Sequence, residues 1–399
     1  MNYTGLISKM FVLVFCILLF LHAYKSATTL PYEGDSINYH IPIAKNILSG
    51  NIITQENVVN IERWYPGATE IILSLFILTG IPLNLFNILA IIVLAIVLYR
   101  LGLIFLIDKD LSKIYSMSIV TLYGVFRLSN TQNIDIWLTI YFILLLILLN
   151  SPKKTMSFFI KLGFLSGMLI GSKYTGPIFF LILSIFYLKS LFKYFNLKNL
   201  IVLLIPLFIF GGFWYIRNLI LTGSPVYPQS ILFFTGLEGW KSYLSVPIWK
   251  AFLNTPLMMI NAYISEMMLW PFLFLLIPFL IKILKKKSFT TYKKINNKIL
   301  LIPITCFLAY LFFPYDNKYE GMVLSVRYIF IVISLLSLYI FILAKSLKID
   351  KLFSTLLLFS VIPFFINPYK PKLIYIYEPI VFVIISYIMF KDKILKLKK

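Results

Sequence analysis

Long apolar segments separated by short polar breaks run along the whole chain. Many of them approach the roughly 20 residues that cross a bilayer, and their apolar residues are continuous rather than alternating. The pattern therefore predicts an all-α polytopic membrane protein. The candidate membrane helices lie near residues 10–30, 67–80, 84–107, 114–129, 136–150, 157–172, 175–190, 198–214, 252–281, 298–314, 328–344, 352–367 and 373–390.

Segment 67–80 differs from the other candidates. It follows Pro66, contains Glu70 and ends at Gly80-Ile81-Pro82. A short segment with these features is expected to lie in the membrane interface as a juxtamembrane helix. Removing it from the count leaves about 12 transmembrane helices.

A second interfacial helix is predicted just before this segment. The apolar positions fall at helical spacing and place Asp35 at the N-terminus of the helix; they are Ile37, Ile41, Ala44, Ile47 and Leu48. We expect one integral-membrane domain, 1–399. Its parts are an outer loop 31–83 with both interfacial helices, core helices 84–214, an outer loop 215–251 and C-terminal helices 252–399.

Composition and charge agree with this class. The chain is 60% hydrophobic and 13% charged, with a mean hydropathy of +0.91, which excludes an ordinary soluble domain. The net charge of +22 does not indicate nucleic-acid binding, because the basic residues cluster between apolar segments as the positive-inside rule expects. The basic loop 282–298 and tail 391–399 are expected to lie against anionic lipid.

Charge also orients the twelve-helix arrangement. With both termini cytoplasmic, the inner side takes 25 of the 37 Lys and Arg residues and 4 of the 15 acids. Asp35 and Asp135 then face the same, outer side of a cell membrane. The first apolar segment is expected to be a retained helix, because no convincing small-residue cleavage site precedes Asp35.

Two acidic positions are the candidate catalytic groups. Asp35 follows the first membrane helix, two residues after Glu33, and Asp135 ends the polar break Ser129–Ile134. Carboxylates at a membrane boundary are more often functional than structural. The alternative for each aspartate, taken alone, is a helix N-cap.

Cations on the same side supply candidate phosphate contacts: Lys173, Arg217 and Arg327. Arginine binds phosphate with two parallel hydrogen bonds, and the glycines that flank Lys173 favour close approach of a ligand. The alternatives are a lysine that reaches the lipid headgroups and arginines that pair with acids. His40 is placed to line the same cavity as Asp35.

Neither cysteine nor histidine spacing fits a metal site. Cys16 and Cys306 lie in apolar segments, and His22 and His40 have no ligands nearby in sequence. A divalent metal is therefore not indicated. The chain also shows no nucleotide-binding loop.

These features together resemble the GT-C superfamily of integral-membrane glycosyltransferases. The resemblance rests on the acid after the first span, the interfacial helices, the second acid, the turn Gly171-Ser172-Lys173-Tyr174-Thr175-Gly176, and Trp214-Tyr215-Ile216-Arg217-Asn218 continuing to Gly223-Ser224-Pro225-Val226-Tyr227-Pro228. It is similar to the protein O-mannosyltransferase and lipid A aminoarabinose transferase type. The motifs are short and extend over most of residues 1–340.

The resemblance implies transfer of a sugar from a polyprenyl-phosphate donor to a glycan, lipid or protein acceptor on the outer face of the membrane. It implies that Asp35, with Glu33 as the competing carboxylate, is the base or the acceptor-orienting group, and that Asp135 is the second acid. Tyr174 and Tyr227 join the candidate substrate contacts. Inversion at the sugar is the expected outcome.

Two other functions share these features. A transporter or flippase of a lipid-linked or anionic substrate also needs outer-facing cations, although such proteins often show internal repeats. A polymerase or ligase of lipid-linked glycans shares the donor chemistry and differs in its acceptor.

Overall fold

The computed structural model describes residues 3–56, 58, 61–105, 108–231, 233–238, 246–267, 297–315, 319–346 and 350–360. Most of them are helical. The elements are α1 (Tyr3–Thr28), η1 (Ser36–His40), α2 (Ile41–Ser49), η2 (Ile61–Trp64), α3 (Glu70–Thr79), η3 (Leu83–Leu85), α4 (Phe86–Ile104), α5 (Lys109–Val120), α6 (Tyr123–Arg127), η4 (Leu128–Asn130), α7 (Asp135–Leu149), α8 (Met156–Ser172), α9 (Gly176–Leu191), η5 (Phe192–Tyr194), α10 (Leu197–Leu207), η6 (Phe208–Gly212), α11 (Phe213–Thr222), β1 (Val246–Pro247), α12 (Ile248–Asn254), α13 (Pro256–Met267), α15 (Lys298–Tyr310), β2 (Pro314–Tyr315), α16 (Tyr319–Ser325), η9 (Val326–Ile329), α17 (Phe330–Ser346) and α18 (Asp350–Ser360).

Apolar helices of membrane-crossing length confirm the predicted class. Within the described ranges, five are long enough: Tyr3–Thr28, Leu83–Ile104, Gly176–Tyr194, Leu197–Thr222 and Gly321–Ser346. Further apolar helices are shorter. The predicted count of twelve is not tested, because segment 373–390 and parts of 252–281 and 352–367 lie outside the described residues. Nearly all of the basic loop 282–298 and the whole tail 391–399 lie outside them too.

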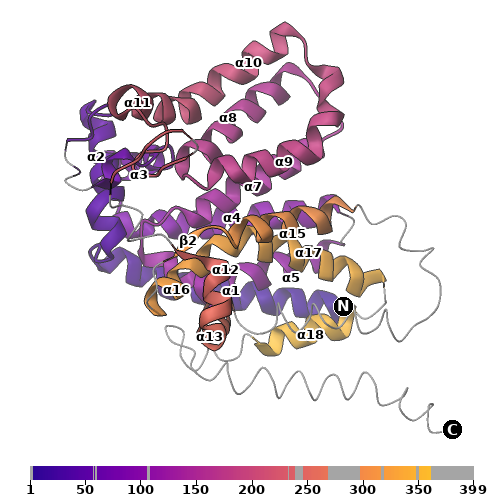
Figure 1. Ribbon diagram of the computed structural model, residues 1–399. Helices are drawn as coiled ribbons and strands as arrows, with labels where there is room; N and C mark the ends of the chain where they lie inside the picture. The colour runs from indigo at the N-terminus through magenta and orange to yellow at the C-terminus, as the bar shows by residue number, and fades with distance from the viewer. Residues whose placement is uncertain are drawn as a thin grey trace, which may run out of the picture.

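The helices are arranged in two groups around α4 and α7. In Figure 1, α8, α9 and α10 form one group, and α1, α5, α15, α17 and α18 form the other. α4 packs against both α5 and α7, and α7 packs against α8. The buried core runs continuously through both groups.

Segment 67–80 forms α3, a helix of 10 residues. At 1.5 Å per residue it is about 15 Å long, half the hydrocarbon thickness of a bilayer. It ends at Gly80, which has a φ of 69°, and packs against α2. Its length agrees with the prediction that it does not span; its position relative to lipid stays a prediction.

The helix predicted from Ile37 is divided at Ile41. Residues Ser36–His40 form a π-helical turn, and α2 follows to Ser49. Pro42 has no N–H to donate to Asn38, and the N–H of Ile41 bonds instead to the carbonyl of Ser36. The apolar face also differs from the prediction, since Ile37 and Leu48 are exposed.

Helix ends differ from the predicted segments at two places. α11 extends into the segment predicted as the second outer loop, 215–251, and continues to Thr222 before Gly223, whose φ is 77°. Segment 114–129 is not one helix: α5 ends at Val120 and α6 begins at Tyr123.

A row of glycines joins α8 to α10 and η6. Gly163, Gly167 and Gly171 recur every four residues and so share one face of α8. A Cβ on Gly163 would lie 2.1 Å from the carbonyl oxygen of Leu203, and one on Gly171 would approach that of Phe210 even more closely. Glycines at this spacing let two membrane helices bring their backbones together.

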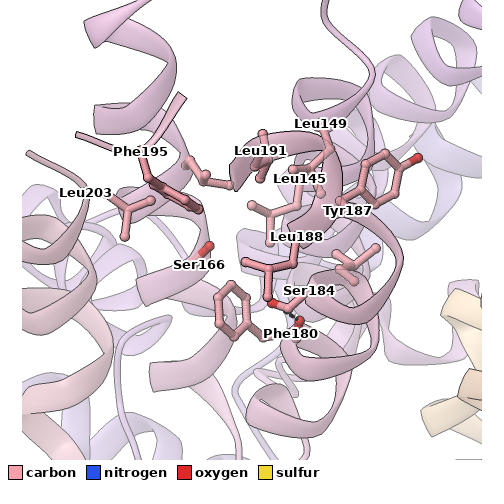
Figure 2. Close-up of a pocket in the computed structure, with 12 residues that line it drawn as sticks. Leu145, Leu149, Ser166, Phe180, Ser184, Tyr187, Leu188, Leu191, Phe195 and Leu203 are labelled. Atoms are coloured by element: carbon pink, nitrogen blue, oxygen red, sulfur yellow. Dashed lines mark hydrogen bonds between the residues drawn. The ribbon is translucent and has the colours of Figure 1, made fainter. Parts of the chain in front are cut away.

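An apolar cavity of about 120 Å³ lies among α7, α8, α9 and α10. Figure 2 shows mainly leucines and phenylalanines around it, together with the hydroxyl-bearing side chains of Ser166, Ser184 and Tyr187. The Ser184 hydroxyl donates to the Phe180 carbonyl. The cavity is near the C-terminal half of α7, whereas Asp135 begins that helix, so it is separate from the charged residues.

We predict that Gly163→Ala destabilises the fold by about 1 to 3 kcal/mol, the usual effect of overpacking. Alanine otherwise favours helix over glycine, so a loss of stability reports the backbone contact. Gly34→Ala is the control, because its Cβ would meet nothing closer than 3.9 Å. Thermal unfolding in mild detergent is the measurement; equal stability of the two variants would contradict the close packing.

Candidate active site

The loop after α1 and the polar break before α7 are fastened to each other. Glu33 Oε2 accepts hydrogen bonds from the backbone N–H and the hydroxyl of Ser36, at 2.9 and 2.8 Å. The Ser36 hydroxyl accepts from the backbone N–H of Gln132 at 2.9 Å. Asn87 on α4 holds the same polar break by donating to the carbonyls of Thr131 and Asn133. These bonds bring Asp35 towards Asp135.

Capping does not explain either aspartate. Asp35 precedes η1 without making a side-chain cap, and Glu33 bonds the N–H of Ser36 instead. Asp135 is the first residue of α7, and the position before it is Ile134. Both carboxylates are engaged by cations, as described next.

Arg327 joins the two aspartates. Its Nη2 lies 3.0 Å from Asp35 Oδ2, and its Nε lies 3.2 Å from Asp135 Oδ2. Its Nη1 donates to the Asn133 side-chain oxygen at 2.7 Å. The Arg327 and Asp135 side chains are 7% and 2% exposed, whereas Asp35 is 37% exposed. Asp35 is therefore the carboxylate at the opening of this cluster.

Lys173 completes the charge balance. Its Nζ lies 2.7 Å from Asp135 Oδ1 and 4.2 Å from the centre of the Tyr328 ring. Two carboxylates thus meet two cations, and we call these four residues the charged cluster: Asp35, Asp135, Lys173 and Arg327. The structure confirms that the two aspartates lie at the same end of the fold.

The opposite end holds the residues assigned to the cytoplasm. The Ser8 hydroxyl near the start of α1 bonds to Asp110 at 3.0 Å. Lys345 at the end of α17 lies 3.7 Å from Asp108. Asp108, Asp110 and Lys345, which the charge-based topology assigns to the cytoplasmic side, thus lie near one another and away from the charged cluster.

The glycines beside Lys173 pack against the protein backbone. A Cβ on Gly171 would meet the Phe210 carbonyl, and one on Gly176 would meet the Leu169 carbonyl. The backbone carbonyl of Gly171 accepts from the N–H of Ala68 at 2.8 Å. Close packing against the backbone therefore explains why glycine occupies these two positions, without approach of a ligand.

Arg217 occupies a second polar site. It is 4% exposed and donates to the Asn218 side-chain oxygen at 2.7 Å and to the Trp64 carbonyl at 3.0 Å. Its guanidinium lies 5.0 Å from the centre of the Trp214 ring. Among the described residues no carboxylate pairs with it, so its charge is held by neutral acceptors and aromatic rings.

Tyr174 and Tyr227 belong to this second site. The Tyr174 hydroxyl lies 2.8 Å from the Trp64 carbonyl and 2.5 Å from the Tyr227 carbonyl, and it accepts from Asn218 at 2.9 Å. The Tyr227 ring packs edge-on against Trp64. The Arg217 site therefore consists of Trp64, Tyr174, Arg217, Asn218 and Tyr227.

Aromatic residues connect the two sites. The Tyr39 ring packs against Tyr65, and Tyr65 packs against Tyr174, at centroid distances of 5.5 and 5.7 Å. Burial raises the pKa of all three phenols well above the usual range. They are neutral groups at physiological pH and leave the charges to the neighbouring acids and cations.

His40 lies beside the charged cluster and pairs with Glu70. The His40 Nδ1 is 2.6 Å from Glu70 Oε1, and both side chains are almost fully buried. The alignment of a π-helical turn brings residue 40 near residue 35. That His40 lines the same cavity as Asp35 stays a prediction.

Electrostatics favour an ionised Asp35. Burial alone raises the pKa of this carboxyl, but neighbouring positive charge, chiefly that of Arg327, outweighs burial and holds the pKa below its usual value. The carboxylate form is therefore present throughout the physiological range.

Several residues of the site were not predicted. Asn133 and Trp64 have no distinguishing local pattern, and Glu70 is a single acid in the apolar segment 67–80. Arg127 forms a second ion pair, 2.7 Å from Glu266. Gly124 admits that glutamate, because a Cβ there would lie 3.0 Å from its carboxylate. A carboxylate within an apolar segment is the one sequence signal that marks Glu70 and Glu266.

No group of three or more His, Cys, Asp or Glu side chains suited to a metal ion occurs in the described part of the chain. The carboxylates of Asp35 and Asp135 face Arg327 and Lys173. This arrangement therefore defines no set of metal ligands among the described residues.

Comparison with solved structures gives a likeness over almost the whole chain. The crystal structure of ArnT from Cupriavidus metallidurans bound to undecaprenyl phosphate matches with a TM-score of 0.55 and 12% identity, and the match covers 98% of this chain and 71% of that chain. The fold is GT-C-like. No protein-family model and no curated protein matches the sequence. The resemblance predicted from the motifs is thus confirmed for the fold.

We predict that Arg327→Gln lowers the free energy of unfolding by about 3 to 5 kcal/mol, because Asp135 then loses a buried partner. Arg63→Gln is the control, since Arg63 is exposed and its guanidinium packs on the Trp64 ring. Unfolding in mild detergent measures both. A variant as stable as the control would show that the bridge is unimportant for the fold.

Proposed function

We propose that the protein is a membrane glycosyltransferase that takes a sugar from a polyprenyl-phosphate donor. The observation that carries the proposal is the charged cluster, which lies beside the Arg217 site in a GT-C-like fold. The ArnT structure with a similar fold is bound to undecaprenyl phosphate. Transfer of this kind needs a carboxylate near the acceptor and cations near the leaving phosphate.

Asp35 is the carboxylate best placed to meet an acceptor. Asp35 is more exposed than Arg327, its ion-pair partner. Its negative charge also stabilises the positive charge that develops at the sugar carbon. Glu33 uses one carboxylate oxygen for two hydrogen bonds to Ser36. We assign catalysis to Asp35 and a structural role to Glu33.

Arg217 is the cation best placed for the donor phosphate. Arg327 and Lys173 are already neutralised by Asp35 and Asp135. Arg217 instead keeps its positive charge among carbonyls and aromatic rings, and a phosphate supplies the missing anion. Asp135, through Lys173 and Arg327, positions the charged cluster.

The reaction is assigned to the outer face of a cell membrane by the distribution of Lys and Arg along the chain. The two short helices α2 and α3 then lie at the outer interface. Single displacement with inversion is the stereochemistry we expect, and a glycan, lipid or protein is the acceptor.

A transporter of a lipid-linked substrate is the second candidate, because the ion pairs of the charged cluster also resemble a binding site for a moving anion. The two functions differ in their product. A glycosyltransferase cleaves its donor and releases polyprenyl phosphate, whereas a transporter returns the donor intact. Purified protein in detergent, given a panel of radiolabelled polyprenyl-phosphate sugars, distinguishes them.

We predict that Asp35→Asn lowers the turnover number about 10² to 10³-fold, the usual effect of removing one group that stabilises charge in the transition state. Asparagine keeps the size and one acceptor oxygen for Arg327 but removes the charge. Glu33→Gln is the matched control and retains turnover. If Asp35→Asn works normally and Glu33→Gln is inactive, the assignment of the two carboxylates is reversed.

We predict that Arg217→Gln weakens donor binding about 10 to 100-fold, the equivalent of 1.5 to 3 kcal/mol for a charge-assisted hydrogen bond. Lys250→Gln is the control, because Lys250 is exposed and lies beside Trp249. The KM for donor measures the effect. An unchanged KM in Arg217→Gln would remove this residue from the phosphate site.

A further inference from the structure

The His40–Glu70 pair has the arrangement of a general base with an orienting carboxylate. The Nδ1–H of a neutral His40 donates to Glu70 Oε1 at 2.6 Å, which leaves the lone pair on Nε2. Nε2 is buried and has no hydrogen-bond partner. A buried polar atom of this kind calls for an explanation, and the same relation of base and carboxylate occurs in nucleophile-activating triads.

From this geometry we propose that His40 Nε2 is the group that removes the proton from the acceptor, that Glu70 orients it, and that the acceptor nucleophile is a hydroxyl group. The inference rests on the proposed function. It assigns Asp35 to orienting the hydroxyl and to stabilising charge, and it gives the buried pair a role in the same site.

Asp35 is poorly suited to accept the proton. Arg327 holds it as a carboxylate, and a base with a depressed pKa has little driving force for proton transfer near neutral pH. An imidazole titrates in the range that general-base catalysis needs. The two residues thus divide orientation and proton removal between them.

The π-helical turn explains how both reach one reaction centre. Hydrogen bonds in this turn join residues five apart, as from Ile41 N–H to the Ser36 carbonyl. Residue 40 therefore lies one turn from residue 35. A positive charge on His40 would lower the pKa of both Asp35 and Asp135, as expected for a ring on the same side of the fold as these acids.

The proposed step is balanced as follows. The acceptor oxygen forms a bond to the anomeric carbon, and its proton passes to His40 Nε2, directly or through one water. The bond between the anomeric carbon and the phosphate oxygen breaks, and its electron pair leaves with polyprenyl phosphate. The imidazolium then loses the proton to water. An ionised phosphate acceptor would need no such base, so the pair indicates a hydroxyl acceptor.

Charged and titratable groups from several elements surround His40. Glu70 on α3 contacts it directly; Asp35 and Tyr39 lie on its own turn, and Asp135 begins α7. Beyond the two aspartates lie the cations from other elements, Arg327 of η9 and Lys173 between α8 and α9.

The first test compares nucleophiles, with polyprenyl phosphate glucose as the donor if the wild type accepts it, or otherwise the active member of the donor panel. Water and methanol carry a proton that must be removed, whereas azide carries none. We expect His40→Gln to slow transfer to water and methanol at least 100-fold and to form glycosyl azide at the wild-type rate. Equal losses for azide and methanol would overturn the proposal, because a structural role affects both alike.

The second test uses pH and the fact that the chain has only two histidines. We expect kcat/KM of the wild type to fall on the acid side as His40 becomes protonated, with no such limb in His40→Gln. Glu70→Gln moves the limb to lower pH, because loss of the carboxylate destabilises the imidazolium. His22→Gln is the control and keeps the wild-type profile; its imidazole lies on α1, 2.8 Å from the Ser129 hydroxyl, and does not contact Glu70.

A third measurement does not depend on variants that fold. Nitrogen NMR of wild-type protein labelled in histidine gives two imidazole spectra, and the His22→Gln sample identifies that of His40. A titration midpoint equal to the acid limb supports the proposal, and a His40 that does not titrate across the limb overturns it. A wild type that cleaves no lipid-linked sugar with any nucleophile would instead refute the proposed function.

Discussion

The contact on which the site depends is the bridge from Arg327 to Asp35 and Asp135. One guanidinium joins the loop after α1 to the start of α7, and it does so from η9, far along the chain. Two carboxylates this close and this poorly solvated would repel each other or lose their charge without a cation between them. Lys173 supplies a second positive charge to Asp135. The result is a balanced cluster whose most accessible carboxylate is Asp35.

Backbone packing decides where these charges meet. The glycine row of α8 brings its backbone against α10 and η6, and the carbonyl of Gly171 fastens the segment before α3. Those contacts fix the end of α8, from which Lys173 continues, and the start of α11, which carries Arg217. The π-helical turn η1 then aligns Asp35 with His40. Small residues and a single proline thus place four chemically important side chains.

The two sites complement each other for a donor with an anionic leaving group. The charged cluster offers a carboxylate beside cations that are already neutralised, and the Arg217 site offers a positive charge without a carboxylate among the described residues. The aromatic residues Tyr39, Tyr65 and Tyr174 lie between them. Such neutral, rigid groups bind the faces of a sugar ring well. This division of labour is the basis on which a lipid-linked donor is proposed.

The sequence alone determined the class of protein and much of the candidate site. Continuous apolar segments predicted membrane helices because only a helix satisfies its own backbone in lipid. The uneven distribution of charge predicted that Asp35, Asp135, Lys173 and Arg327 lie on one side. Lysine and arginine are costly to move across a membrane, so they are enriched in the cytoplasmic loops. The structure brings these four residues into contact.

Only the tertiary structure decided how they pair. Nothing local shows that Arg327 binds both aspartates, that Glu33 bonds Ser36, or that Glu70 lies 2.6 Å from His40 across 30 residues of chain. The glycines beside Lys173 likewise have the same sequence signature whether a ligand or a neighbouring helix approaches them. Such pairings depend on distances between separate helices, and those are set by packing of the whole chain rather than by residue type or spacing.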